Sequence, residues 1–220
     1  MTSILKVNNI QSSASNAAAT IASNGAVTFP QSATFSGGAA FSGTVTGASP
    51  TVIVSSGNAA SAISELEIDL PTDASYHKFE LSIHDIYFSA DTDLATLFRV
   101  QGGSYSGSYT YSTMERTYGA SPSGASNNSG SGNAQLSYYN IGDAKVEANS
   151  YNITITNNKT ASYHTKYFYT AYGLASNANA TVRVGGGSVY SLEINDRMKL
   201  YPLSGTMYHG EWVLYGWKKS

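Results

Sequence analysis

From Ser64 the pattern of the chain changes to a strict alternation of hydrophobic and polar residues. The segment ELEIDL places Leu66, Ile68 and Leu70 on one face and acidic residues on the other, which is typical of a half-buried β-strand. The segment HKFELSIHDIYFS, residues 77–89, repeats this period of two. The other segments predicted as strands, separated by clusters of Gly, Asn, Ser and Thr, are DLATLFRVQ (93–101), SYTYST (108–113), AQLSYYN (134–140), YNITITN (151–157), TKYFYTAYG (165–173), ATVRV (180–184), SVYSLEINDRMKLYP (188–202) and GEWVLYGW (210–217).

These segments amount to about ten strands at short spacing, with no helical pattern between them. We therefore predict an all-β fold in which residues 59–220 form an antiparallel, jelly-roll-like β-sandwich. A jelly roll is favoured over an immunoglobulin-like sandwich because of the strand number and because the chain contains no cysteine. Very little helix is expected, since the residues that favour helices are scarce.

A different pattern precedes the sandwich, in residues 24–58. Phe29, Phe35 and Phe41 recur every six residues among Gly, Ala, Ser and Thr. Six is an even number, so in an extended chain the three rings point the same way. A single extended segment cannot bury them, whereas several identical chains around one axis can. We predict a short, extended oligomeric β stalk with these rings at the interface between its chains.

Residues 1–23 are too few and too small to form a core of their own. Ile4, Leu5, Val7 and Ile10 allow one short strand, and residues 17–22 allow a helical turn without an amphipathic face. We expect this segment to dock on another protein through its four apolar residues.

The composition of the chain argues against several classes of function. Charged residues make up 12% of the chain, about half the usual share, and the net charge is −2, which speaks against nucleic-acid binding. The absence of cysteine excludes disulfides and cysteine-ligated metals. No apolar run is long enough to span a membrane, so no membrane insertion is expected.

Candidate chemistry is sparse. Asp91 and Asp93 have the spacing that begins a calcium loop, but the rest of that loop is missing. The acidic face of ELEIDL is explained by strand alternation and does not require a catalytic carboxylate pair. The glycines at 185–187 lack the spacing and the following helix of a phosphate-binding turn. We therefore predict no catalytic residue, no metal site and no cofactor.

Seventeen tyrosines are the other unusual feature. Tyrosine binds partners well because its rigid amphipathic ring loses little entropy on contact, and such rings also stack on sugars. Residues 119–133, rich in Gly, Ser and Asn, are predicted to be a flexible loop. The tyrosines just before this loop are the candidate surface-recognition residues: Tyr105, Tyr109, Tyr111 and Tyr118.

The C-terminal run RMKLYPLSGTMYHGEWVLYGWKK, residues 197–219, resembles the closing hairpin of a β-sandwich domain in bacteriophage virion proteins. The residues that carry the resemblance are Ser204, Gly205, Gly210, Leu214, Tyr215 and Gly216. Residues 68–103 look like the opening strands of the same domain, and MTSILKVNNIQ looks like the N-terminus of tail-fibre-like proteins. Glu211 and Trp212 depart from the pattern, since small residues usually follow that glycine in the group.

The resemblance implies a homotrimeric virion appendage, assembled in the host cytoplasm. Its N-terminus would bind another virion protein, and its distal knob would contact the host. The expected function is that of a non-enzymatic short tail fibre whose knob binds a host surface glycan or protein. A head fibre or capsid decoration protein needs the same three parts and stays open as an alternative. A fibre-borne glycan depolymerase and a cellular carbohydrate-binding module fit less well, because acidic residues are few and such modules need no stalk.

Overall fold

A computed structural model gives the fold of two compact units, Met1–Ala48 and Ser49–Ser220. The structure describes residues 9–11, 17–21, 27–28, 51–73, 75–119, 123–137, 141–156, 158, 161–175, 179–190 and 192–218. In the first unit three strands pair antiparallel in the order β1 (Asn9–Gln11), β2 (Ala17–Ile21) and β3 (Val27–Thr28). Residues 17–21 are therefore a strand and not the helical turn that we predicted.

The second unit is an antiparallel β-sandwich, which confirms the predicted all-β fold. Its only helical element among the described residues is one 3-10 turn, η1 (Lys145–Glu147). Its strands are β4 (Thr51–Ile63), β5 (Leu66–Asp69), β6 (Tyr76–Phe88), β7 (Leu94–Val100), β8 (Tyr109–Thr117), β9 (Ser123–Ser131), β10 (Ala134–Gln135), β11 (Asn149–Thr156), β12 (Lys166–Leu174), β13 (Ala180–Val189), β14 (Asn195–Pro202) and β15 (Met207–Lys218).

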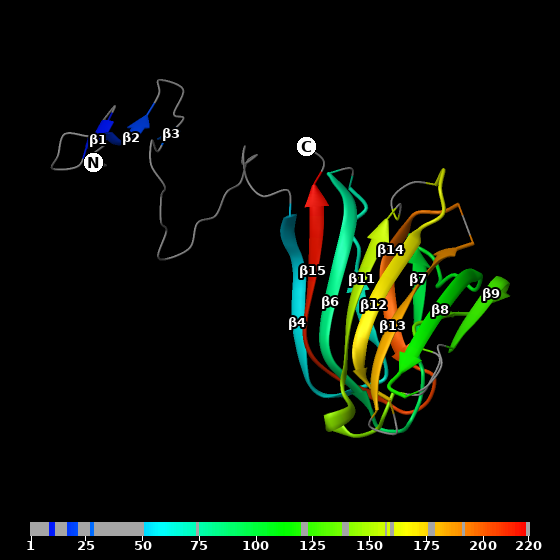
Figure 1. Cartoon of the computed structure of the whole chain (residues 1–220). Helices are drawn as coiled ribbons and strands as arrows, with labels where there is room; N and C mark the ends of the chain where they lie inside the picture. Colours follow the sequence, from blue (N-terminus) through cyan, green and yellow to red (C-terminus); the bar gives the residue numbers. More distant parts are fainter. Residues whose placement is uncertain are drawn as a thin grey trace. The chain divides into compact units, whose positions relative to one another are not determined.

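The two sheets of the sandwich differ in width. The larger sheet has eight strands in the order β4-β15-β6-β11-β12-β13-β8-β9, and the smaller has four in the order β10-β7-β14-β5. Figure 1 shows the larger sheet as a continuous layer from β4 to β9, with β7 and β14 of the smaller sheet on its other side. Each face that meets the other sheet carries the hydrophobic half of the alternating pattern.

The core lies between the sheets. Ile68 and Leu70 of β5 and Phe79, Leu81 and Ile83 of β6 are all almost fully buried, as their alternation predicted. Burying side chains of this size contributes about 1.5–3 kcal/mol each relative to exposure. In these two segments the alternation therefore predicts both that the segment is a strand and which of its faces is buried.

Two strands of the larger sheet lie where we predicted none. β4 begins at Thr51, so residues 51–58, which we assigned to the stalk, pair with β15 and belong to the sandwich sheet. β9 lies within residues 119–133, which we predicted to be a flexible loop, and pairs with β8. Both are edge strands, and backbone pairing with one neighbour holds them without a hydrophobic alternation in their sequence.

The predicted docking and trimer residues cannot be placed. Ile4, Leu5 and Val7 and the three rings Phe29, Phe35 and Phe41 lie outside the described residues. For Ile10 the structure gives only its backbone position in β1. The docking segment and the trimeric stalk therefore stay predictions.

Candidate functional site

An open groove crosses one end of the larger sheet. It encloses about 970 Å³, which is at the upper end of the range for ligand pockets. Its walls come from β6, β11, β12, β13 and β8, which are consecutive neighbours in the sheet although they are far apart in the sequence. We call it the strand-end groove. The polar, charged and aromatic side chains that line it and are used below are His84, Asp85, Arg116, Tyr118 and Tyr172.

A β-bulge in β6 builds the first end of this groove. Asp85 has φ 59°, the only positive φ of a non-glycine residue in the described part of the chain. Across this point Asn149 pairs with Ile86 and Tyr151 with Ile83, so β6 has one extra residue. The bulge therefore interrupts the alternation and leaves His84 and Asp85 both exposed, although they are adjacent in sequence.

Gly210 of the neighbouring strand β15 allows the bulge. A Cβ at Gly210 would lie 3.1 Å from the backbone oxygen of His84 and 3.3 Å from the Oδ2 of Asp85. A larger residue would crowd the bulge and push the Asp85 carboxylate away. Left-handed backbone at a non-glycine residue is concentrated at functional sites, and aspartate tolerates it better than most residues.

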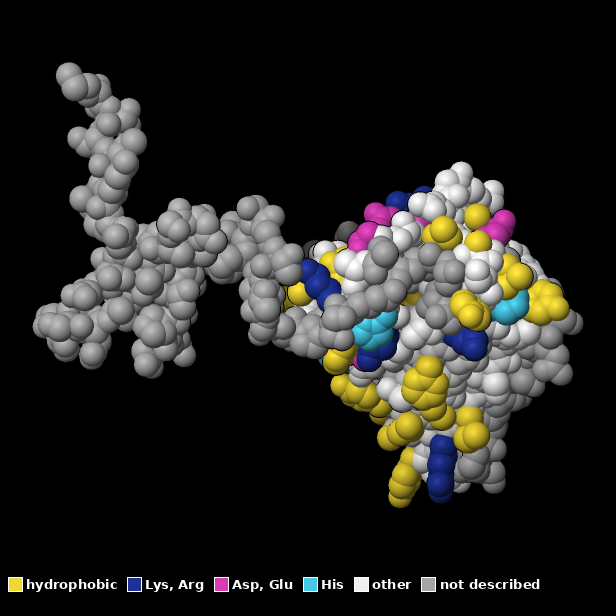
Figure 2. Space-filling model, turned by 90° about the horizontal axis from the view of Figure 1, so that it is seen from above, with side chains coloured by type: hydrophobic (Ala, Val, Ile, Leu, Met, Phe, Trp, Pro, Cys, Tyr) yellow, Lys and Arg dark blue, Asp and Glu magenta, His cyan; other side chains and the backbone are white. Residues whose placement is uncertain are grey.

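One cross-strand row forms the other part of the groove. Arg116 on β8 pairs with Val182 on β13, which pairs with Tyr172 on β12, so these side chains stand in line on the outer face. Tyr172 is 57% exposed and Val182 63% exposed. Figure 2 shows hydrophobic side chains standing out along the lower edge of that view and acidic ones mainly near its upper edge, with basic side chains spread between them.

Arg116 differs from the other arginines in the described part of the chain. Arg99, Arg183 and Arg197 each pair with a carboxylate. Arg116 is exposed and forms no ion pair with any residue that the structure describes. A guanidinium that is held beside exposed apolar surface and lacks an internal carboxylate is available to an external anion.

The four tyrosines predicted to be surface-recognition residues differ in their exposure and in their contacts. Tyr118 is 81% exposed and lines the groove. Tyr109 is fully buried, and its hydroxyl accepts a hydrogen bond from the Phe98 N–H at 2.8 Å. Burial raises the pKa of Tyr109 to about 12. The prediction of Tyr109 as a surface residue is therefore wrong, because its side chain falls on the inward face of β8.

Tyr105 and Tyr111 are partly buried and have partners within the chain. The Tyr105 hydroxyl donates to the Glu67 carboxylate, and the Lys199 Nζ lies 4.3 Å from the centre of the Tyr105 ring. The Tyr111 hydroxyl donates to Gln135 at 3.3 Å. Neither residue lines the groove, so Tyr118 is the member of the predicted set that the groove contains.

The acidic residues of β5, and Glu65 just before it, form ion pairs with β14. Glu65 pairs with Lys199 at 2.9 Å, and Arg197 contacts both Glu67 and Asp69. The hydrogen bond from Tyr105, followed by the charge of Arg197, lowers the pKa of Glu67 against the effect of desolvation. A carboxylate held ionised in this way is a poor general acid, which agrees with our structural interpretation of this strand.

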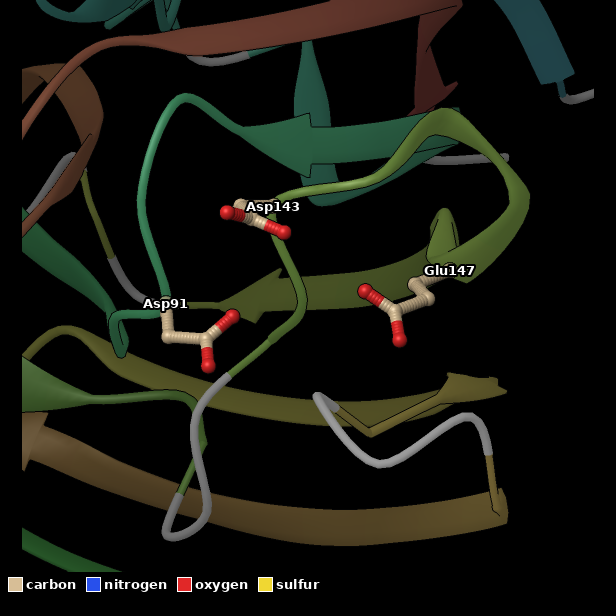
Figure 3. A group of neighbouring side chains, drawn as sticks. All are labelled: Asp91, Asp143 and Glu147. Atoms are coloured by element: carbon tan, nitrogen blue, oxygen red, sulfur yellow. The ribbon is translucent and has the colours of Figure 1, made fainter.

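Three other carboxylates come together at a loop. Oxygen atoms of Asp91, Asp143 and Glu147 all lie within 4.8 Å of one another, and Figure 3 shows their side chains around the loop that leads into η1. Asp93, which we paired with Asp91 in considering a calcium loop, instead accepts a hydrogen bond from Ser137 at 3.0 Å. The Glu147 carboxylate accepts the Ala144 N–H at 3.4 Å. Asp91 and Asp143 are exposed and Glu147 is buried, and no second feature of the described residues points to an ion.

A serine and a histidine also lie in contact near the groove. The Ser82 hydroxyl is 3.3 Å from the His84 Nε2, two residues along β6. The same hydroxyl donates to the Asn152 side-chain oxygen at 3.0 Å, so its proton is not directed at the histidine. The contact lies on an open sheet face, and no carboxylate of the described residues forms a hydrogen bond with His84, as one would in a nucleophile–base pair.

The three glycines at 185–187 serve packing. They lie within β13, where a Cβ at Gly185 would be 2.8 Å from the Tyr169 hydroxyl and one at Gly187 would be 2.7 Å from the Tyr167 hydroxyl. The two glycines leave space for the buried tyrosine rings of β12. The segment is a strand and not a phosphate-binding turn.

Within the described residues, no helix is long and apolar enough to cross a bilayer. Comparisons of the chain with protein-family models, with curated proteins and with solved structures found no match.

Proposed function

We propose that this protein is a non-enzymatic virion appendage, a trimeric short tail fibre whose β-sandwich binds the surface of a host cell. The observation that carries the proposal is the strand-end groove, which is wide, open and lined by exposed tyrosine and by Arg116, an arginine that forms no ion pair with any described residue. Broad, shallow sites of this composition suit recognition of extended surface molecules. The resemblance of residues 197–219 to phage virion proteins supports the same assignment.

Binding is favoured over hydrolysis by the placement of the acidic residues. Glycoside hydrolysis needs two carboxylates that face each other across a cleft. Asp85 is the only carboxylate among the described residues that line the strand-end groove. The acidic residues of β5 lie on the other sheet and are paired with basic side chains.

A fibre of this kind gains avidity from repetition. A contact that is weak at one groove becomes strong when three copies of the sandwich, on many appendages, engage one surface, because later contacts form at high effective concentration. The predicted stalk with Phe29, Phe35 and Phe41 would supply the threefold presentation, and the N-terminal segment would attach it to the particle.

The test combines the oligomeric state with the location of the protein. We expect sedimentation equilibrium of the purified chain to give three times the monomer mass of 23.2 kDa. Antibodies against the purified chain are expected to label the tail of the phage particle in electron micrographs. If the antibodies label the head, the protein is a head fibre and not a tail fibre. If the particle carries none of the protein, the proposal is refuted.

A further inference from the structure

The strand-end groove also indicates the chemical class of its ligand. We infer that it binds an acidic oligosaccharide, a chain of sugar rings that carries a carboxylate. Arg116 binds the carboxylate, Tyr172 stacks on a ring, and Asp85 accepts hydrogen bonds from sugar hydroxyls at the opposite end. This inference rests on the proposed function, because a protein that attaches to cells needs a ligand on their surface.

The length of the groove requires a chain of sugars and not a single ring. Asp85 is on β6 and Arg116 on β8, with β11, β12 and β13 between them. Neighbouring strands are about 4.8 Å apart, so four spacings separate these residues by roughly 19 Å along the sheet. Tyr172, on β12, lies halfway, where it can hold the middle of an oligosaccharide.

The charges at the two ends act independently. The Debye length is about 8 Å at physiological ionic strength, so over roughly 19 Å the Asp85 carboxylate does not neutralise the field near Arg116. A guanidinium binds a carboxylate through two parallel hydrogen bonds, which gives direction as well as charge. The ligand therefore has its anionic group at the β8 end and neutral hydroxyls at the β6 end.

Aromatic side chains account for the remaining contacts. Tyr172 and Tyr118 are mostly exposed and both line the groove. A tyrosine ring offers an apolar face to the C–H groups of a sugar and a hydroxyl to its oxygens, and it loses little entropy on binding.

An extended peptide fits this groove less well. Peptides that bind β-sheets usually add a strand to an edge, where unpaired backbone groups are available. The strand-end groove runs across five neighbouring strands, at right angles to the direction that a peptide strand would need, and its middle strands β11, β12 and β13 are paired on both sides. A compact apolar ligand fits poorly too, because the groove is open and carries charge at each end.

The experiment uses the full chain and three tetrasaccharide probes, with dissociation constants measured by calorimetry and by ligand-observed NMR. Tetragalacturonic acid is the carboxylate probe, and its complete methyl ester is the neutral probe of the same shape. A heparin-derived tetrasaccharide tests whether sulfate replaces carboxylate. We expect the carboxylate probe to bind at least about tenfold more tightly than its ester, since a charge-assisted two-point contact exceeds a neutral one by about that factor.

Four variants assign the contacts. Arg116→Gln is expected to abolish the preference for the acid over its ester, while changing the affinity for the ester less than about twofold. Tyr172→Ala is expected to weaken both probes by about tenfold, the loss of roughly one stacked ring. Phe168→Ala and Lys166→Ala are matched controls on the same strand and face, outside the groove, and should change neither affinity.

The outcomes separate this inference from the proposed function. Absence of binding by the carboxylate probe, tighter binding of the heparin-derived probe, or equal loss in the Phe168→Ala control would overturn the inference. The labelled chain is also tested for binding to host cells. If Arg116→Gln and Tyr172→Ala bind these cells as well as the wild type does, the inference is overturned while the attachment function stands. Binding of the probes by a chain that occurs on no virion would support the groove assignment and refute the proposed function.

Discussion

Arg183 and Glu115 face each other on β13 and β8 and form a two-point ion pair that is wholly buried. The Arg183 Nε and Nη2 donate to the two Glu115 oxygens at 2.9 and 3.0 Å, and both side chains are 0% exposed. The Asn149 side-chain oxygen accepts a further hydrogen bond from Arg183. A buried pair with both partners satisfied is tolerated, but either charge alone is costly.

The first prediction concerns this pair. Glu115→Ala is expected to lower the free energy of unfolding by about 3–5 kcal/mol, because it leaves the Arg183 charge buried without a partner. Urea unfolding monitored by fluorescence measures the loss. Glu65→Ala, which removes the surface partner of Lys199, is the control and should cost less than about 1 kcal/mol.

A double variant completes that test. Replacing both partners by apolar residues, as in Glu115→Leu with Arg183→Met, is expected to recover most of the lost stability, because no buried charge remains. If the double variant is as unstable as Glu115→Ala, the cost arises from packing and not from the unpaired charge.

The second prediction concerns the glycines of β13. Gly187→Ala is expected to destabilise the sandwich by about 1–3 kcal/mol, since the new Cβ would lie 2.1 Å from the Thr110 backbone oxygen. Thermal unfolding by circular dichroism measures the change. Gly107→Ala is the matched control, because no atom lies within 4 Å of a Cβ at that position, and it should change stability by less than about 1 kcal/mol.

The third prediction is a pH dependence that arises from Asp93. Desolvation raises the pKa of Asp93 above its ordinary value of 3.8, so between the two pKa values the folded state binds more protons than the unfolded state. The stability that Asp93 contributes is therefore complete below pH 3.8 and falls as the pH rises through the folded pKa.

Urea unfolding of the wild type and of Asp93→Asn across this range tests it. The stability of Asp93→Asn relative to the wild type is expected to increase with pH, because the variant carries no titrating group at that position. Ser137→Ala removes a hydrogen bond that lowers the pKa of Asp93, so it should steepen the decline. A relative stability that is constant with pH would contradict the assignment.

The fourth prediction addresses the cluster of Asp91, Asp143 and Glu147. Without an ion their like charges repel, so Asp143→Asn is expected to raise the melting temperature by about 1–3 °C. The measurement is made once in a chelator and once in millimolar calcium. A melting temperature of the wild type that rises with calcium, together with a loss of that rise in Asp143→Asn, would show instead that the cluster binds the ion.

The fifth prediction concerns the stalk. Phe35→Asp is expected to convert the predicted trimer to monomers in sedimentation experiments, because an aspartate at a shared axis brings three charges together. The circular dichroism and the melting behaviour of the sandwich should be retained. Loss of the folded sandwich together with the trimer would show that the two parts are not separable.

The alternation of residue types was sufficient to predict most of the sandwich. In β5 and β6 a period of two identifies the strand and its buried face without reference to any other part of the chain. The same pattern explained the acidic face of β5, whose side chains form ion pairs with β14. Edge strands β4 and β9 escaped prediction because their sequences lack a regular hydrophobic alternation, and each pairs through its backbone with one neighbour, β15 and β8 respectively.

The groove depended on information that no local pattern contains. Asp85, Tyr172 and Arg116 are brought together by the order of five strands and by a bulge that turns two adjacent residues to the same side. Tyr118, exposed in the groove, and Tyr109, buried nine residues earlier, lie on opposite faces, as an odd separation along an extended chain requires. Local periodicity therefore determined the strands and the all-β class, whereas strand order and register, which depend on contacts between distant segments, decided where a ligand can bind.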